Sequence, residues 1–278
     1  VFSRKETARG QHPACFTNGD FDLMEMLKDK HVVITGGGSG IGAVIAEALA
    51  KSGAKTTIMG RNYQRLQEKT EQLAQGFATT VDVTDEEKVN IAFQMAVQQH
   101  GIIDILINNA GNAISVPFEK MKAEQWNEML ALNLSGVFHC TQACLPAMKK
   151  QKWGRIINIA STAALKGYAY VSAYCAAKHG VIGLTRALAL ETANAGITVN
   201  AICPGYTETA LTESAIENIS LKTGRTKTEA REELLKNNPQ KRFIQPEEIA
   251  NTVLWLCQHE AASVTGQAIS ISGGEVMS

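Results

Sequence analysis

A tyrosine and a lysine four positions apart, Tyr174 and Lys178, are the residues with the clearest potential for chemistry. The run around them, SAYCAAKHGVIGLTRALALE, has small and aliphatic residues at helical spacing and therefore predicts a helix. Residues four apart share a helix face, with Cβ atoms about 5–6 Å apart. The ammonium would then lower the pKa of the phenol from its usual value of about 10. The pair predicts proton exchange near neutral pH, although an ordinary amphipathic helix has the same spacing.

A serine stands at the end of the apolar run GRIINIAS, thirteen positions before Tyr174. The run predicts a buried strand, and the carboxyl ends of parallel strands meet at one edge of a sheet. We therefore expect Ser161 to face the helix that carries Tyr174. A hydroxyl at this place can hold a substrate oxygen beside the phenol.

A glycine-rich turn precedes these residues. The segments HVVIT, GGGSGIG and AVIAEALAKSG predict a strand, a turn and a helix in succession. Such a turn brings backbone N–H groups close to a pyrophosphate, and the helix N-terminus adds a partial positive charge. We assign Gly36, Gly40 and Gly42 to this contact, although a tight loop without a ligand uses the same residues.

The end of the next predicted strand, residues 54–59, indicates which cofactor is used. NAD-dependent enzymes usually carry an Asp or Glu at this place, but here Gly60 and Arg61 follow. Without the carboxylate nothing repels a 2′-phosphate, and a guanidinium binds phosphate through two hydrogen bonds. NADP(H) is therefore favoured, NAD(H) remains possible, and a solvated Arg61 is the alternative. Asp82, after the following strand, is a candidate for an adenine contact or a turn-forming residue.

The alternation of apolar strands and amphipathic helices predicts an α/β fold. We expect a single Rossmann-type, doubly wound parallel sheet of about seven strands, with helices on both faces. Residues 210–242 form an insertion with helical periodicity, which predicts a substrate lid. Residues 1–26 mix charges, Gly and Pro without a period and predict a poorly ordered extension before a domain spanning 27–278.

Composition excludes several classes of function. The chain has 278 residues, with 27 Lys plus Arg and 27 Asp plus Glu, so no basic surplus recruits nucleic acid. The six cysteines and six histidines show no ligand spacing, so no metal is expected. No apolar run reaches the roughly 20 residues of a membrane helix. We expect a soluble cytoplasmic protein that does not bind membranes, or an organelle-matrix protein if the N-terminal arm is a remnant of a targeting segment.

Taken together, six motifs resemble the short-chain dehydrogenase/reductase family from about residue 27 onward. They are TGGGSGIG (35–42), NNAG (108–111), Asn133 in LNLSG, Ser161, YCAAK (174–178) and PG (204–205). The resemblance implies hydride transfer between a nicotinamide and a carbonyl or alcohol carbon. It makes Tyr174 the acid/base and Ser161 the group that orients the substrate oxygen. It makes Lys178 the cation that lowers the tyrosine pKa and binds the nicotinamide ribose, and Asn133 the holder of a relay water.

The resemblance also implies a set of cofactor contacts. Residues 204–209 resemble the segment that contacts the nicotinamide carboxamide, with Thr209 at its hydroxyl position. The implied contacts are Gly36, Ser39, Gly40, Ile41, Gly42, Arg61, Asp82, Val83, Asn109, Ala110, Gly111, Tyr174, Lys178, Pro204, Gly205, Thr207 and Thr209.

The expected substrate pocket is almost wholly apolar or aromatic, and nothing in it is placed to bind a carboxylate. Its walls are Ala113, Ile114, Ala163, Ala164, Leu165, Tyr168, Val171, Tyr206 and Leu211. The lid is similar to that of 3-hydroxybutyrate dehydrogenases, but those enzymes carry polar and cationic ligands where Ala113, Ala163 and Val171 stand here. Other segments look like ketoreductases that act on 3-oxoacyl or polyketide thioesters. A larger ketone or an acyl thioester is therefore expected.

We thus expect an NADP(H)-dependent oxidoreductase that interconverts a ketone and a secondary alcohol. The basic residues of the lid suit a CoA or carrier-protein phosphate, and a solvated helix face explains them equally. Helices 123–150 and 172–193 have more apolar residues than one buried face needs, and in the family they pair between subunits, so a homotetramer or dimer is expected. The alternatives are an NAD-dependent alcohol or 3-hydroxyacyl dehydrogenase and a catalytically silent structural subunit.

Overall fold

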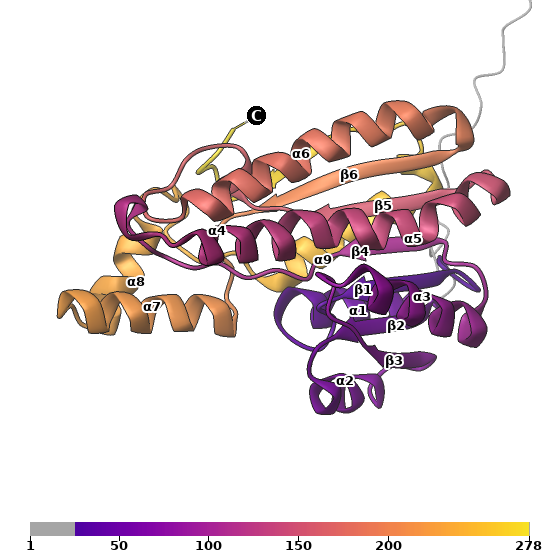
Figure 1. The fold of residues 1–278 in the computed structure, drawn as a ribbon, viewed down its shortest axis with the longest axis horizontal. Coiled ribbons are helices and arrows are strands. Elements are labelled where there is room, and N and C mark those ends of the chain that lie inside the picture. Colours follow the sequence, from indigo (N-terminus) through magenta and orange to yellow (C-terminus); the bar gives the residue numbers. More distant parts are fainter. Residues whose placement is uncertain (1–25, 278) are drawn as a thin grey trace, which may run out of the picture.

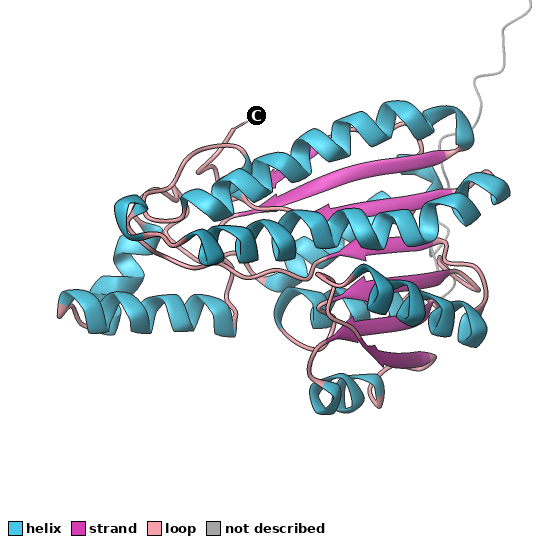
Figure 2. Ribbon diagram, in the orientation of Figure 1, coloured by secondary structure: helices cyan, strands magenta, loops and turns pink. Residues whose placement is uncertain are grey.

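The structure, a computed structural model, describes residues 26–277, and its centre is a parallel sheet (Figures 1 and 2). The predicted extension lies, except for Met26, outside the described residues. The strand order is β3-β2-β1-β4-β5-β6-β7, so the direction of winding reverses between β1 and β4. The predicted doubly wound sheet of seven strands is confirmed. The strands are β1 (His31–Thr35), β2 (Lys55–Gly60), β3 (Gly76–Thr80), β4 (Ile105–Asn108), β5 (Gly154–Ile159), β6 (Ile197–Pro204) and β7 (Ala268–Ile271).

Helices cover both faces of the sheet. In Figure 1, α3, α5 and α6 lie in front of the strands, and α1 and α9 lie behind them. The α-helices are α1 (Gly40–Lys51), α2 (Tyr63–Thr70), α3 (Glu86–His100), α4 (Ala123–Leu130), α5 (Gly136–Gln151), α6 (Ser172–Thr192), α7 (Ala210–Thr223), α8 (Lys227–Leu235) and α9 (Pro246–Cys257). The short helical turns are η2 (Phe118–Lys120), η3 (Ala131–Ser135), η4 (Thr162–Ala164), η5 (Ala193–Ala195) and η6 (His259–Ala261).

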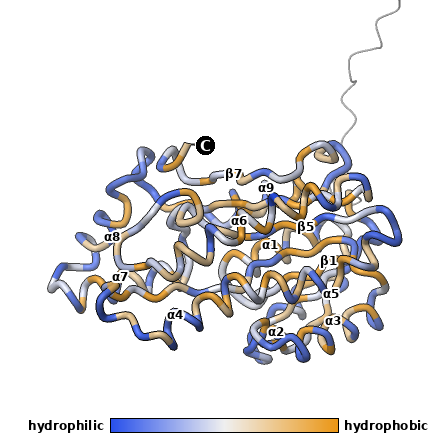
Figure 3. Tube along the Cα trace, turned by 45° about the horizontal axis from the view of Figure 1, so that its top comes forward, coloured by the Kyte–Doolittle hydropathy of each residue, from blue (hydrophilic) through white to orange (hydrophobic). Residues whose placement is uncertain are grey.

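The core consists of two layers, one on each side of the strands. Side chains alternate between the faces of a strand, so Val32 and Ile34 pack in the layer under α1 and α9, and Val33 packs in the layer under α3 and α5. Because both faces are covered, the central strands β1 (HVVIT) and β4 (ILIN) consist mostly of apolar residues, and β1 and β5 are largely hydrophobic in Figure 3. Within residues 26–277, no helix has the length and apolar character needed to cross a membrane.

The helix predicted over residues 123–150 is not uniform. A π-helical turn, η3, joins α4 to α5 and contains Asn133, which is fully buried. The Asn133 amide donates to the backbone oxygens of Met129 (3.1 Å) and Asn112 (2.9 Å), and its Oδ1 accepts from Asn112 N (3.3 Å). The wider turn is thus held by side-chain hydrogen bonds, which is typical of π turns at functional sites.

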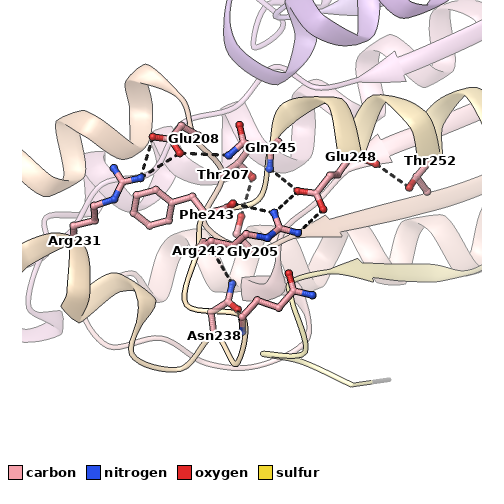
Figure 4. A network of polar contacts seen from close by, with 11 residues as sticks. Gly205, Thr207, Glu208, Arg231, Asn238, Arg242, Phe243, Gln245, Glu248 and Thr252 are labelled. Atoms are coloured by element: carbon pink, nitrogen blue, oxygen red, sulfur yellow. Dashed lines mark hydrogen bonds and ion pairs between the residues drawn. The ribbon is translucent and has the colours of Figure 1, made fainter.

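The predicted lid is a pair of helices, α7 and α8, which extends from the body at the C-terminal edge of the sheet (Figure 1). Their contact is a small apolar cluster of Ile216, Ala230, Leu235 and Phe243. Figure 4 shows polar contacts where the pair joins the body, among them two hydrogen bonds from Arg231 to the Glu208 carboxylate. The predicted lid thus has its own core and a polar attachment, and its closure over a substrate stays a prediction.

Candidate active site

Tyr174 and Lys178 lie on one face of α6, as their spacing predicts. The Lys178 Nζ lies 5.7 Å from the centroid of the Tyr174 ring. Lys178 is buried, and its ammonium donates to the backbone oxygen of Ile159 at 2.8 Å. Because Ile159 is the last residue of β5, the strand end fixes the position of the ammonium beside the phenol.

Burial controls the protonation of this pair. It raises the pKa of Tyr174 to about 12, and a hydrogen bond with the Ser161 hydroxyl offsets this only in part. It lowers the pKa of Lys178 to about 8. The expectation that the tyrosine pKa is lowered is therefore wrong for the polypeptide alone, because desolvation of the phenolate outweighs the hydrogen bond with Ser161. At neutral pH the phenol keeps its proton.

Ser161 follows β5 and faces Tyr174. Its backbone is extended, and its Oγ accepts a hydrogen bond from Ala163 N at 3.1 Å, which caps η4. An acceptor role toward the backbone leaves the hydroxyl proton free for another oxygen. With the Tyr174 contact, this geometry suits the predicted role of holding a substrate oxygen.

Asn133 and Lys178 meet at Gly111. A Cβ on Gly111 would lie 2.8 Å from Asn133 Oδ1 and 3.6 Å from Lys178 Nζ. The end of the NNAG segment therefore touches both side chains, and only glycine fits there without displacing one of them. The structure brings together all four predicted catalytic residues, from η3, the end of β5 and α6.

The glycine turn is held by the NNAG segment. Gly36 and Gly40 have positive φ values of 67° and 55°, and a Cβ on Gly42 would overlap Gly36 O and Asn109 Nδ2. The Asn109 amide donates to the backbone oxygens of Thr35 (3.0 Å) and Gly36 (3.2 Å). Thr35 Oγ1 in turn accepts from the backbone N–H groups of Asn109 and Ala110, both at 3.0 Å. The Asn109 side chain thus supports the turn.

The turn and the start of α1 fit the phosphates of a dinucleotide. Ser39, the N-cap of α1, makes no side-chain capping bond, so the first N–H groups of the helix keep their capacity to bind an anion. A Cβ on Gly40 would lie 3.6 Å from Thr209 Cγ2. The predicted phosphate segment 36–42 and the predicted nicotinamide segment 204–209 therefore meet at one edge of the sheet.

Arg61 and Asp82 lie beyond β2 and β3 and are electrostatically coupled. Burial raises the pKa of Asp82, but hydrogen bonds from Thr84 N (3.0 Å) and Oγ1 (2.8 Å) and the charge of Arg61 outweigh it, so the pKa lies below its usual value. Asp82 thus accepts hydrogen bonds within its own turn, and its contact with adenine stays a prediction. Arg61 is exposed directly after β2, where a cofactor ribose is expected. Val83 is buried, and its backbone oxygen accepts from His139 Nδ1 at 3.0 Å.

Comparison with known proteins identifies the family. The profile described as short chain dehydrogenase matches residues 30–220. The chain belongs to this family. It is 41% identical to the D-beta-hydroxybutyrate dehydrogenase of Rhizobium meliloti (strain 1021), over 88% of this chain and 98% of that protein. It is 38% identical to the 3-oxoacyl-(acyl-carrier-protein) reductase FabG of Thermotoga maritima, over 90% of this chain and 99% of that protein.

A solved structure agrees with the family assignment. A variant of actinorhodin polyketide ketoreductase, crystallised with NADPH, matches this short-chain dehydrogenase with a TM-score of 0.86 and 36% identity, covering 88% of this chain and 97% of that one. Among residues 26–277 of the dehydrogenase, no cluster of His, Cys, Asp and Glu is arranged to hold a metal ion.

The expected pocket walls differ in accessibility. Ala163 and Ala164 are buried, and Ala164 packs in the core with Val137 and Val181. Leu165 packs against the same cluster, and Leu211 is half exposed in the first turn of α7. Tyr168 and Tyr206 face each other edge to face, with ring centroids 6.4 Å apart. Ala113, Ile114 and Val171 are partly exposed on the segments before α4 and α6.

Two residues near the site, Glu275 and Asn112, were not predicted from the sequence. Glu275, in the C-terminal tail, is buried beside Tyr168 and Lys166. Asn112, directly after the NNAG segment, pairs through its backbone with Asn133. The adjacency of Asn112 to NNAG was a usable signal, but Glu275 lies 107 positions from Tyr168, and no local pattern connects them.

Proposed function

We propose that this short-chain dehydrogenase is an NADP(H)-dependent oxidoreductase that reduces a ketone to a secondary alcohol and catalyses the reverse reaction. The observation that carries the proposal is the convergence of Asn133, Ser161, Tyr174 and Lys178 at one sheet edge, beside the glycine turn. A structural subunit would need none of these four groups. Burial of a lysine and of an asparagine costs folding free energy, so their presence at this edge favours a catalytic role.

The side chains divide the work of moving one proton. NADP(H), when bound, supplies or accepts the hydride. Ser161 donates a hydrogen bond to the substrate oxygen, and Tyr174 gives that oxygen a proton during reduction. With a pKa of about 12, the phenol is protonated at neutral pH and so is prepared for the reductive direction. Lys178, held by Ile159 O, faces the ring and stabilises the phenolate as the proton leaves. Asn133 holds the route by which the proton is replaced.

Arg61 supports the choice of NADP(H). It is exposed at the end of β2, and Gly60 stands directly before it where NAD-dependent enzymes place a carboxylate. A guanidinium binds a phosphate through paired hydrogen bonds. The related ketoreductase whose structure contains NADPH is consistent with this choice.

The substrate that the pocket favours is a 3-oxoacyl thioester or another sizeable apolar ketone. Tyr168, Tyr206, Leu165 and Leu211 supply apolar and aromatic surface. The name of the Thermotoga maritima reductase gives its substrate as a 3-oxoacyl group on an acyl-carrier protein, and the proposal extends that substrate class to this chain. The name of the Rhizobium meliloti relative favours a second candidate, a small 3-hydroxy acid.

The chemistry is tested by turnover. We expect NADPH-dependent reduction of ethyl acetoacetate and of a 3-oxoacyl thioester, and we expect Tyr174→Phe to lower kcat by about 10²–10⁴-fold because the proton donor is lost. NADPH binding by the variant, followed by fluorescence, should stay close to that of the parent. Tyr170→Phe removes an exposed phenol near the site and is the matched control. A Tyr174→Phe enzyme as active as the parent would disprove the role of Tyr174.

The cofactor choice is tested separately. Arg61→Ala should weaken NADPH binding by at least about tenfold, since a charge-assisted pair with the 2′-phosphate is lost. NADH has no such phosphate and is the internal control, so its affinity should not change. Equal affinities for NADPH before and after the substitution would contradict the assignment.

A further inference from the structure

A buried carboxylate lies beside the expected substrate pocket. The Glu275 side chain is only 2% exposed, and its Oε1 accepts from Lys166 Nζ at 2.9 Å and from the Tyr168 hydroxyl at 2.7 Å. The Tyr168 hydroxyl also lies 2.8 Å from Thr162 Oγ1. The C-terminal tail is thus attached to the loop between Ser161 and α6 through a paired charge.

This carboxylate and the proposed proton donor, Tyr174, both lie near Tyr206. Tyr206 packs against Tyr168 and is close enough to both Tyr174 and Glu275 to interact electrostatically with each. On its other side, Glu275 Oε2 lies 3.5 Å from the position of a Cβ on Gly205. Glu275 therefore stands between the substrate loop and the segment expected to bind the nicotinamide.

The pairing decides what charge the pocket presents. Lys166 is partly exposed, with its Nζ 4.8 Å from the centroid of the Tyr168 ring, so an unpaired ammonium here would attract an anionic substrate. Glu275 neutralises that ammonium. A substrate carboxylate that approached Lys166 would also meet the Glu275 charge in a desolvated place, where like charges repel strongly.

We propose that Glu275 is a specificity-determining residue that excludes substrates with a free carboxylate and leaves neutral 3-oxo esters and thioesters as the substrates. This inference rests on the proposed ketone reduction. It separates the chain from the activity named for its Rhizobium meliloti relative, whose substrate is a hydroxy acid.

The test compares two matched ketones, acetoacetate and its neutral ethyl ester, with NADPH. The parent should favour the ester. Glu275→Gln keeps an acceptor for Tyr168 but frees the Lys166 charge, so kcat/KM for acetoacetate relative to the ester should rise at least about tenfold. The double variant Lys166→Met with Glu275→Gln has no free cation and should lose this gain.

Glu47→Gln is the matched control, because it breaks another partly buried Lys–Glu pair, with Lys69, on α1 and α2. It should leave the ratio at the parent value. A parent that reduces both compounds equally well, or a Glu275→Gln variant with an unchanged ratio, would overturn the proposal.

Binding of butanoate, measured by calorimetry, gives a readout that does not depend on turnover. We expect Glu275→Gln to bind butanoate at least about tenfold more tightly than the parent and than the double variant. If neither ketone is reduced, the proposed function fails. The butanoate measurement then decides whether Glu275 excludes carboxylates. Equal butanoate affinities for the parent and Glu275→Gln would refute this role.

Discussion

Gly111 is the residue on which the geometry of the catalytic group depends most directly. A methyl group there would lie 2.8 Å from Asn133 Oδ1, so the amide or the backbone must move. Displacements of about 1 Å at a catalytic group cost up to about 10²-fold in rate. We therefore expect Gly111→Ala to lower kcat for ethyl acetoacetate by at least about tenfold. Gly167→Ala is the control and should leave kcat unchanged, because its methyl group would meet no atom within 4 Å. An equal loss of kcat in both variants would contradict this view.

Local spacing made Tyr174, Lys178 and Ser161 candidates for catalysis, because each lies in a short motif, and their catalytic roles stay predictions. Tyr174 and Lys178 are four apart on one helix, and Ser161 ends a strand, so the fold brings them together without further information. The direction of the Tyr174 pKa was not accessible in this way. It depends on how much water the surrounding residues remove from the phenol, and this desolvation raises the pKa despite the hydrogen bond with Ser161.

Among the elements, β1 contains a buried histidine that makes stability depend on pH. His31 Nδ1 lies 2.8 Å from Gly101 O, and its Nε2 lies 2.9 Å from Thr57 Oγ1. Burial lowers its pKa from 6.5 to about 4. The unfolded chain therefore binds the proton more readily than the folded chain. The contribution of His31 to the free energy of unfolding is fully present above pH 6.5 and is lost as the pH falls from 6.5 through 4.

This loss is measurable by urea unfolding between pH 7 and pH 4. The gap between the two pKa values corresponds to at most about 3 kcal/mol. We expect His31→Gln to be less stable than the parent at pH 7 and to lose correspondingly less stability toward pH 4. The same substitution at exposed His259 should leave the acid dependence of the parent intact. Parallel curves for the parent and His31→Gln would show that His31 is not the group involved.

The attachment of the lid is the second feature at this scale. Arg231 on α8 binds Glu208 through hydrogen bonds of 3.0 and 3.2 Å and lies over the Phe243 ring, 4.3 Å from its centroid (Figure 4). The pair is exposed, so it contributes at most about 1 kcal/mol to global stability. Its effect should instead be local, because it joins the lid to the segment after β6.

We expect Arg231→Met to increase amide hydrogen exchange in residues 207–211 and 235–245 while the midpoint of global unfolding changes little. Methionine keeps much of the packing on Phe243 and removes the charge. Lys227→Met breaks the ion pair with Glu217, which joins α7 to α8 and not to the body, and is the matched control. Exchange that rises equally in both variants would refute a special role for Glu208.

The sequence pattern predicted the elements well where an apolar period is long, as in α6 and β6. It did not predict the π turn at Asn133, because that turn depends on hydrogen bonds to Asn112, 21 positions away. The Glu275 contacts were equally inaccessible, since they depend on the path that the tail takes after β7. The sequence pattern therefore predicted the helices and strands but not the contacts between segments that are distant in the sequence.

For the whole molecule, the apolar surface of α5 and α6 bears on assembly. The two helices cover the same face of the sheet in Figure 1, with Phe138 46% and Leu190 85% exposed. Large apolar side chains exposed on one face of the sheet are candidates for an interface between subunits. We therefore expect a homodimer or homotetramer in which this face is covered.

Light scattering coupled to gel filtration measures the assembly directly. The parent should have a mass two or four times that of the chain. Phe138→Asp should lower the measured mass. A two-fold interface contains each residue twice, so one substitution removes the burial of two phenylalanines, each of which contributes about 1.5–3 kcal/mol, and introduces two desolvated charges. Leu221→Asp changes a residue that is 84% exposed on the lid and should leave the mass unchanged. A monomeric parent would contradict the expectation outright, whereas a mass that falls only with Leu221→Asp would place the interface on the lid.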